Sequence, residues 1–223
     1  MHFLNRSEAA HLLATRLFPY RGQHPLVLGV PRGAVPMARV LADALDGDLD
    51  VVLVRKLRAP GQPELAIGAV DEHGTVLCDS GLVRAGEAHV REEIRRQTEV
   101  LRQKRELYSG VRGPIDRAGR IVIIVDDGIA TGSSMVAAVR AVRARAPRQV
   151  IVAVAVAPPS ALLRVRAEAD EVVCLHPARD LMAVGQFFDD FSEVTDAMVL
   201  DALARPLVHT DPTRRVATQR AGA

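Results

Sequence analysis

Two adjacent carboxylates follow a run of apolar residues near the middle of the chain. Asp126 and Asp127 come directly after Ile121–Val125, and a short loop, residues 128–132, leads from them into Ser133. Free backbone N–H groups and the helix dipole at the start of a helix favour a phosphate group. Carboxylates repel phosphate, but they accept hydrogen bonds from sugar hydroxyls and can hold a hydrated Mg²⁺ ion. The segment therefore predicts a site for a phosphorylated sugar with a metal ion beside it.

Cations lie at the ends of two other predicted strands. Pro31–Gly33 follows the apolar run Leu26–Val30, and Arg55–Arg58 follows Val51–Val54. The first segment is typical of a tight turn that tolerates an anion, although many such turns bind nothing. The second segment holds three cations in four residues, which suits either an anionic ligand or a solvated strand edge. The breaker-rich residues 59–64 that follow predict a mobile loop.

Short apolar runs alternate with longer amphipathic segments along most of the chain. Continuous apolar runs are typical of strands buried on both faces of a parallel sheet, and their alternation with helices is typical of α/β folds. The predicted strands are Leu26–Val30, Val51–Val54, Ile121–Val125, Val150–Ala157 and Glu171–Leu175, and the predicted helices are Ala34–Leu45, Ser133–Arg145 and Ser160–Ala167. We therefore expect an α/β, doubly wound, mainly parallel sheet flanked by helices, with ligands at the carboxyl ends of its strands.

The region between the second and third predicted strands departs from this alternation. Ala66–Val70 and Thr75–Leu77, on either side of residues 71–74, predict a projecting hairpin. Residues 81–108 predict a long charged helix, whose apolar stripe is Val90, Ile94, Leu101 and Tyr108. This helix could lie against the sheet or contact a second copy in a homodimer. Residues 205–223 lack periodicity and predict a disordered tail after one domain of residues 1–204.

Composition and charge exclude several classes of protein. Lysine and arginine total 29 and aspartate and glutamate 27, so the formal net charge is +2, too small for a general nucleic-acid binder. Glu8 interrupts the N-terminal region where a signal peptide needs an apolar run, and no stretch approaches the ~18 apolar residues of a membrane span. We therefore expect a cytoplasmic protein without a nucleic-acid or membrane partner. Cys78 and Cys174 lie far apart and predict free thiols.

The segment from Ile121 to Ser134 resembles the signature of type I phosphoribosyltransferases that binds 5-phosphoribosyl-1-pyrophosphate (PRPP): apolar residues, two acids, and a loop ending in Thr-Gly. The resemblance extends from about Ser7 to Ala204 and implies a parallel sheet capped by a small hood. It implies transfer of the phosphoribosyl group from PRPP to a small nitrogenous base, with release of pyrophosphate and Mg²⁺ as cofactor. Asp126 and Asp127 would hold the ribose hydroxyls and, mostly through water and PRPP, the metal. The other PRPP-binding residues that it implies are Gly128, Ala130, Thr131, Gly132, Ser133 and Ser134.

The same resemblance assigns a role to the cationic segments. The turn after the first strand matches the pyrophosphate loop of the family, and the second cationic segment is similar to the Arg-Lys segment of orotate and adenine phosphoribosyltransferases. The pyrophosphate-binding residues that it implies are Pro31, Arg32, Gly33, Arg55, Lys56 and Arg58. Positioning and neutralisation of charge on the leaving pyrophosphate lower the barrier of such a reaction. Arg32 and Lys56 are therefore candidate catalytic residues, together with the two acids.

Residues 183–190 resemble the Val-Gly-Tyr segment that lines the base pocket of hypoxanthine-guanine enzymes. The base-pocket residues that it implies are Val184, Gly185, Phe187 and Asp189, although packing alone also explains Phe187. Gln186 stands where the family has Tyr, and Ala130 stands where hypoxanthine-guanine enzymes usually carry an Asp. The acceptor is therefore not specified, and a purine-like base is favoured. His176, next to Pro177, predicts a capped loop histidine rather than a ligand.

A PRPP-dependent transferase is the function that these segments predict, and two alternatives stay open. A PRPP- or nucleotide-sensing regulator can use the same fold, but it needs a nucleic-acid-binding domain or a basic face that this sequence does not show. A structural, partner-binding domain with a relict site is favoured by loss of an acid or of the Thr-Gly turn, and both are present here.

Overall fold

A five-stranded parallel sheet forms the centre of the molecule. The computed structural model describes residues 1–59, 61–78 and 86–206. The strands of the sheet are β1 (Leu26–Gly29), β2 (Asp48–Val51), β6 (Ile121–Gly128), β7 (Gln149–Ala157) and β8 (Glu171–Pro177). Their order is β2-β1-β6-β7-β8, and all neighbours are parallel. The predicted mainly parallel α/β sheet is confirmed.

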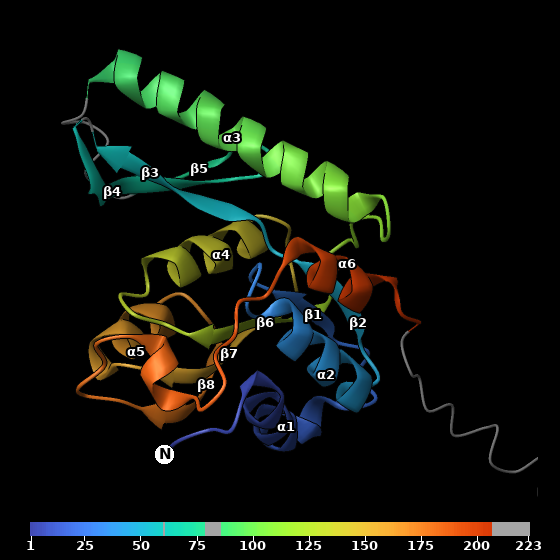
Figure 1. Cartoon of the computed structure of the whole chain (residues 1–223). Coiled ribbons are helices and arrows are strands. Elements are labelled where there is room, and N and C mark those ends of the chain that lie inside the picture. Colours follow the sequence, from blue (N-terminus) through green and yellow to red (C-terminus); the bar gives the residue numbers. More distant parts are fainter. Residues whose placement is uncertain (60, 79–85, 207–223) are drawn as a thin grey trace, which may run out of the picture.

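Helices cover both faces of this sheet (Figure 1). On one face lie α1 (Arg6–Arg16), α2 (Val35–Leu45) and α6 (Asp196–Ala204), and on the other lie α4 (Ser133–Arg143) and α5 (Pro159–Arg166). Alternate residues of β6 point to opposite faces, so that Ile123 packs in the first cluster and Ile124 in the second. The three predicted helices are confirmed to within two residues at each end, whereas α1 and α6 were not predicted.

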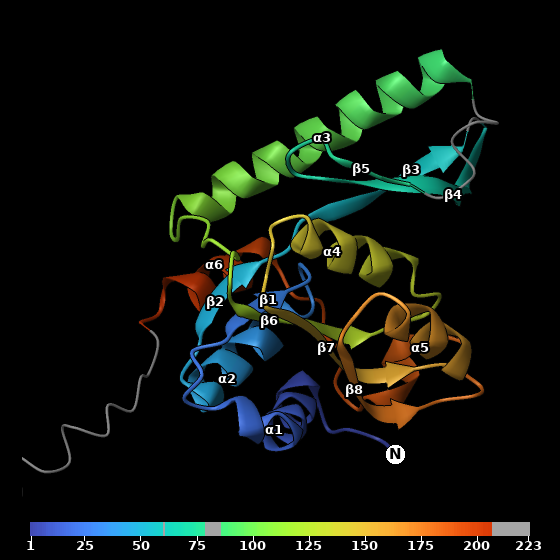
Figure 2. The same ribbon diagram turned by 180° about the vertical axis from the view of Figure 1, so that it is seen from behind.

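A small antiparallel sheet and a long helix form a second layer beyond α4. The strands are β3 (Val54–Ala59), β4 (Gln62–Asp71) and β5 (Val76–Cys78), in the order β3-β4-β5, and the helix is α3 (Glu87–Ser109). We call these four elements the hairpin lobe. Figures 1 and 2 both show its sheet between α3 and α4. The projecting hairpin is thus confirmed, and so is the long helix from Glu87 onward, since residues 79–85 lie outside the described part of the chain.

Two expectations about residues 48–64 are wrong. The parallel strand is β2, which ends at Val51, whereas Val52 and Leu53 only connect it to the hairpin lobe. Charged Asp48 and Asp50 interrupt the apolar pattern and so concealed this strand. The predicted mobile loop at 59–64 is instead mostly strand, because β3 ends at Ala59 and β4 begins at Gln62, which pairs with it; in the short turn between them residue 60 lies outside the described residues. Gly61 supplies the left-handed conformation that this turn needs, with φ of +66°.

Four charged side chains, each at most 13% exposed, join the hairpin lobe to the main sheet. Arg105 of α3 donates from Nη1 to Asp50 Oδ1 of β2 at 2.9 Å, and from Nη2 to Glu72 Oε1 of the hairpin turn, also at 2.9 Å. Arg117 lies 3.5 Å from the same Glu72 oxygen. Asp50 also accepts a backbone hydrogen bond from Ile115. We call these side chains (Asp50, Glu72, Arg105 and Arg117) the lobe-base cluster, and because they come from four segments they fix the lobe on the sheet.

Residues 178–195, between β8 and α6, cover part of the carboxyl edge of the sheet, as a hood does. The N-terminus adds a short extended piece to this segment: Phe3 donates its N–H to Phe187 O at 2.9 Å and accepts from Asp189 N at 2.9 Å. His176 lies in β8 rather than in a capped loop, so that prediction was wrong, and its ring centre lies 5.2 Å from that of Phe187. Of the predicted tail, Arg205 is described, and its carbonyl oxygen accepts a hydrogen bond from Arg39, whereas 207–223 lie outside the described residues.

Candidate functional site

The loop after β6 has the form of a phosphate cradle. Ile129 N donates to Val156 O of the neighbouring strand β7 at 2.9 Å, which fixes the start of the loop. Gly132 has φ of +85°, a left-handed conformation that favours glycine, and it immediately precedes α4. The loop therefore turns sharply into a helix whose first backbone N–H groups have no partner within the helix. Thr131 and Ser133 place their hydroxyl oxygens 3.4 Å apart on this turn.

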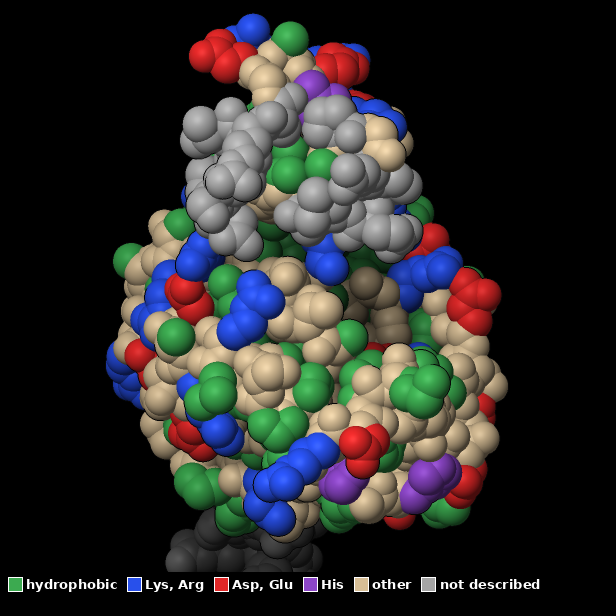
Figure 3. Space-filling view, turned by 90° about the vertical axis from the view of Figure 1, so that its left-hand side faces the viewer, with side chains coloured by type: hydrophobic (Ala, Val, Ile, Leu, Met, Phe, Trp, Pro, Cys, Tyr) green, Lys and Arg blue, Asp and Glu red, His purple; other side chains and the backbone are tan. Residues whose placement is uncertain are grey.

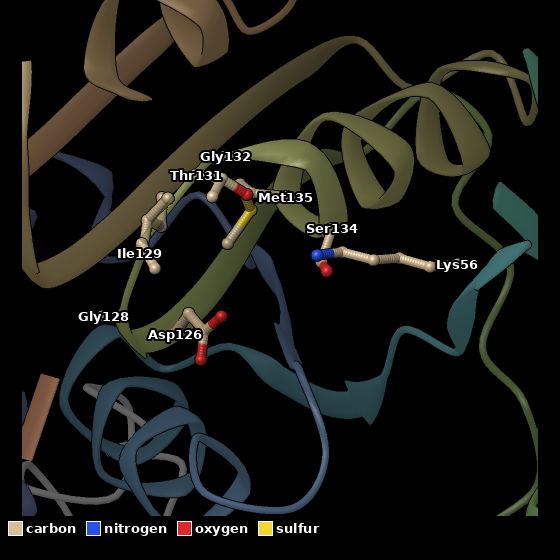
Figure 4. Close-up of a pocket in the computed structure, with 9 residues that line it drawn as sticks. Lys56, Asp126, Gly128, Ile129, Thr131, Gly132, Ser134 and Met135 are labelled. Carbon is tan, nitrogen blue, oxygen red and sulfur yellow. The ribbon is translucent and has the colours of Figure 1, made fainter. Parts of the chain in front are cut away.

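A cavity of about 130 Å³ opens beside this loop, and Figure 3 shows the hollow between the hairpin lobe and the main body of the molecule. Its lining residues come from β6, the loop, α4 and the hairpin lobe: Lys56, Asp126, Gly128, Ile129, Ala130, Thr131, Gly132, Ser134 and Met135. Figure 4 shows the ammonium group of Lys56 pointing toward the Ser134 side chain, across from the Asp126 carboxylate. The structure thus brings one predicted cation, one predicted acid and most of the predicted phosphate loop around one space.

Asp126 lines this cavity and has no cation in direct contact with it among the described side chains. Its Oδ1 accepts a hydrogen bond from the N–H of Asp127 at 2.9 Å. Burial and the neighbouring Asp127 carboxylate raise the pKa of Asp126 well above its usual range, whereas that hydrogen bond and Arg6 act in the opposite direction. Such a carboxylate is stabilised by any ligand that brings hydroxyl donors or positive charge into the cavity.

Asp127 points the other way, toward the Pro31–Gly33 turn. Its Oδ2 accepts a hydrogen bond from Arg6 Nε at 2.8 Å, and both side chains are 14% exposed. A Cβ atom at residue 33 would lie only 2.5 Å from this oxygen, so only glycine lets the turn come so close to the acid. The predicted pyrophosphate loop and the predicted ribose acids are therefore in direct contact.

Arg32 is engaged by acids outside the predicted motifs. The peptide bond between Pro31 and Arg32 is cis, and the Arg32 side chain is 40% exposed. Its Nη2 donates to Glu193 Oε1 at 2.5 Å, and its Nη1 lies 3.9 Å from Asp196 Oδ2. Asp196 also accepts from Lys104 Nζ and the Tyr108 hydroxyl, so it connects the turn to α3. In this conformation Arg32 faces α6 rather than the cavity.

The three predicted cations of residues 55–58 separate because they belong to a strand. Side chains alternate along a strand, and Lys56 and Val54 face α4, whereas Arg55 shares the face of buried Leu57. Arg58 follows a β-bulge, and its backbone groups bond to Glu93 and to a histidine of α3. Of these cations, Lys56 is the one that lines the cavity.

The predicted base-pocket residues separate in a similar way. Val184 lies against the site, because a Cβ atom at Gly128 would be 2.4 Å from Val184 Cγ1, and Gly185 packs against the ring of Phe191. Phe187 instead faces His176, and Asp189 Oδ1 lies 3.1 Å from His2 Nδ1, with its side chain 62% exposed.

The side chain of Gln186, which stands where the family has Tyr, is hydrogen-bonded within its own loop. Its Oε1 accepts from the N–H groups of Met182 and Ala183, and its Nε2 donates to Asp180 O at 3.0 Å. All three bonds tie its side chain to its own loop, so Gln186 orders residues 180–186 instead of contacting a base.

The donor groups do not form a metal site on their own. Among the described residues, no three His, Cys, Asp or Glu side chains come close enough together to hold a metal ion. Asp127 is already engaged by Arg6, which leaves Asp126 as the acid that faces the cavity. Asp126 is therefore the carboxylate of this cavity, among the described residues, that could give oxygen ligands to a divalent cation. Within the same part of the chain, no helix has the length and apolar character to cross a membrane.

Residues 4–187 match the family model of the phosphoribosyl transferase domain, so the chain belongs to that family. Among solved structures it is similar to TT1426 from Thermus thermophilus, at 47% identity and a TM-score of 0.83, over 92% of this chain and 98% of that one. It is also similar to "Putative phosphoribosyl transferase Rv0571c" and "Putative phosphoribosyl transferase MT0597" from two strains of Mycobacterium tuberculosis, each 40% identical over 206 residues. That match covers 91% of this chain and 46% of each relative, so the chain spans about half the length of these curated relatives.

Several residues of the site were not found from the sequence. Arg6, Glu193 and Asp196 all contact predicted site residues, but they lie in α1, before α6 and at its start, outside the recognised motifs. Nothing in their local sequence marks them. Ile129 and Met135, in contrast, line the cavity and fall inside or next to the phosphate loop, so the motif could have indicated them.

Proposed function

We propose that this protein transfers the 5-phosphoribosyl group from PRPP to a nitrogenous base, with release of pyrophosphate. The observation that carries this proposal is the cavity in which Lys56, Asp126 and the loop 128–134 meet. A cradle of N–H and hydroxyl groups suits the 5′-phosphate. The Asp126 carboxylate, at the end of β6 just before this loop, suits the ribose hydroxyls. Membership of the phosphoribosyl transferase domain family supports the same function.

Charge neutralisation is the main contribution that these residues can make to catalysis. Negative charge grows on the diphosphate as the bond from C1 to oxygen breaks, so a cation held nearby stabilises the transition state more than the ground state. Lys56 already points into the cavity, and Arg32 sits on the turn that contacts Asp127. For Arg32 to reach a diphosphate, its side chain must leave Glu193 and Asp196. A bound diphosphate offers it a more highly charged partner than either carboxylate.

Mg²⁺ is part of this proposal as a component of the substrate complex. The diphosphate supplies most of the oxygen ligands, and Asp126 contributes through water or through the ribose hydroxyls. The protein then needs no preformed metal site. Weak binding of Mg²⁺ without PRPP is expected.

The acceptor is proposed to be a purine-like base that needs little help from a protein base. Ala130 lines the cavity and cannot take a proton. Val184 packs closely on Gly128 at the end of β6, so an acceptor in the cavity would lie beside this contact and not between the two segments. Backbone groups and small apolar side chains would then discriminate between bases.

Incubation with PRPP, Mg²⁺ and a panel of purine and pyrimidine bases tests this proposal, with pyrophosphate release as the readout. We expect release that depends on one base or a few related bases, and on Mg²⁺. Binding of PRPP without release for any base would instead favour a PRPP-sensing protein. No binding of PRPP at all would contradict both functions.

A further inference from the structure

Arg6 links three segments of the molecule at the edge of the site. It is the first residue of α1, and its Nε donates to Asp127 Oδ2 at 2.8 Å. Its Nη1 donates to the carbonyl oxygen of Ser192 at 2.8 Å, and its guanidinium carbon lies 3.7 Å from the centre of the Phe191 ring. Arg6 is thus held by an acid, a carbonyl and an aromatic face at once.

The surroundings leave Asp127 few other positions. The Gly33 backbone closes over the ion pair, since a Cβ atom there would lie 2.5 Å from Asp127 Oδ2 and 3.4 Å from Arg6 Nη2. Asp127 and Asp126 are adjacent carboxylates, so without a cation they repel each other and Asp127 loses its fixed rotamer. Arg6 supplies the one cation that the structure places in direct contact with either acid among the described side chains.

The guanidinium group of Arg6 also contacts the segment that we propose to hold the acceptor base. Phe191, on which the guanidinium rests, packs against Gly185, with Cδ1 only 2.9 Å from the position of a Cβ atom there. Gly185 belongs to the same short helix as Val184, which touches Gly128 at the end of β6. One side chain therefore connects the ribose acid to the segment that we propose to hold the base.

We propose that Arg6 is a positioning residue of the active site, which anchors Asp127, whose N–H binds Asp126 Oδ1 at the cavity, and couples it to segment 184–192. This inference rests on the proposed PRPP-dependent function. In this assignment Arg6 contacts no substrate, and its Nε and Nη1 donate to Asp127 and Ser192. Its effect should therefore pass through Asp127.

A double-mutant cycle tests this dependence, with calorimetric binding of Mg·PRPP as the readout. Arg6→Gln and Asp127→Asn are each expected to raise the Kd about tenfold, whereas the double variant should be little worse than either single variant. Arg6→Lys keeps the charge but not the bond to Ser192, and it should recover part of the loss. Arg16→Gln, an exposed site in the last turn of the same helix, is the matched control and should bind like the parent protein.

Three results would overturn the inference. If the losses multiply to about a hundredfold in the double variant, Arg6 acts on the fold in general and not through Asp127. If folded Arg6→Gln binds as tightly as the parent, Arg6 has no positioning role. Should Arg6→Gln not fold, Arg6→Met takes its place, because it keeps an apolar contact with Phe191 but carries no charge. If Arg6→Met binds as tightly as the parent while Asp127→Asn binds more weakly, Arg6 again has no positioning role. Failure of the parent itself to bind Mg·PRPP contradicts the proposed function first, and this inference with it.

Discussion

Two clusters of charged side chains in this protein look alike but are balanced differently. The lobe-base cluster contains two carboxylates, Asp50 and Glu72, and two guanidinium groups that lie between them. The site contains two carboxylates, Asp126 and Asp127, with one guanidinium group, that of Arg6. In the first cluster every charge has an opposite partner within the protein. In the second, Asp126 faces an open cavity.

The hydrogen bonds of the two clusters show the same contrast. Asp50 accepts from the N–H of Val51, from Ile115 N and from Arg105. Asp126 accepts from the N–H of Asp127, and burial beside that second acid raises its pKa well above the usual range. The comparison indicates that a balanced buried cluster holds elements together, whereas an unbalanced one at a cavity is completed by a ligand. Substitutions in and around the two clusters test this distinction.

The largest effect is expected from breaking the balanced cluster. Arg105→Ala leaves Asp50 and Glu72 buried beside Arg117 alone, and loss of one partner of a buried pair costs about 3–5 kcal/mol of unfolding free energy. Urea denaturation measures this loss. Arg102→Ala, on the same helix in an exposed pair with Glu99, is the control and should change stability by less than ~0.5 kcal/mol. A loss below ~1 kcal/mol for Arg105→Ala would mean that the lobe does not depend on this cluster.

The next largest effect concerns the cation that the lobe presents to the cavity. Lys56→Ala should lower kcat/KM about 100-fold, equivalent to ~2.7 kcal/mol, because a charge that neutralises phosphate is lost. Steady-state kinetics with a base accepted in the panel measures it. Arg55→Ala provides a matched control from the opposite face of β3 and should change kcat/KM less than about threefold. A Lys56→Ala enzyme within about twofold of the parent would make this lysine an ordinary surface charge.

A smaller loss of stability is expected where Gly128, at the end of β6, contacts Val184. Gly128→Ala places a methyl group 2.4 Å from Val184 Cγ1, and such overpacking costs about 1–3 kcal/mol of stability. Truncation of the neighbour in Gly128→Ala/Val184→Ala should recover at least half of that loss in thermal unfolding. If the two substitutions simply add, the two segments are not in the contact that we describe.

The smallest effect is expected at the exposed pair that holds Arg32 away from the cavity. Glu193→Gln should change stability by less than ~0.5 kcal/mol, because both side chains are well exposed. It should tighten Mg·PRPP binding about two- to threefold, or ~0.5 kcal/mol, because Arg32 no longer has to leave a carboxylate. Asp201→Asn, which removes the exposed partner of Arg205 on α6, is the control and should leave binding unchanged. Weaker binding by Glu193→Gln would show that Glu193 assists the site instead of competing for Arg32.

The same contrast explains which parts of the molecule were predictable from the sequence. The phosphate cradle and the acid pair are encoded by consecutive residues, 121–134, so strand, loop and helix signals all fall within one segment. The parallel sheet was predictable for a similar reason, since most of its buried strands are continuous apolar runs. Strand β2 was not, because its Asp50 makes a buried ion pair with Arg105, 55 residues away.

Contacts between distant segments account for the rest. Arg6 and Asp127 are 121 residues apart, and Arg32 and Glu193 are 161 residues apart, so no local pattern relates them. Strand β3 was taken for the end of the preceding strand because three of its residues are cations, although Lys56 and Arg55 face opposite sides. The positions of Phe187 and Asp189 depend on pairing with Phe3 and His2 at the other end of the chain.

Calorimetric titration of Mg·PRPP into the parent protein and into Asp126→Asn/Asp127→Asn tests the central claim most directly. Both proteins are first checked for a native circular dichroism spectrum. We predict that the parent binds Mg·PRPP and that the folded double variant binds at least tenfold more weakly, a loss of about 1.4 kcal/mol. Equal affinity of the folded double variant and the parent would contradict the assignment of this acid pair to the ribose.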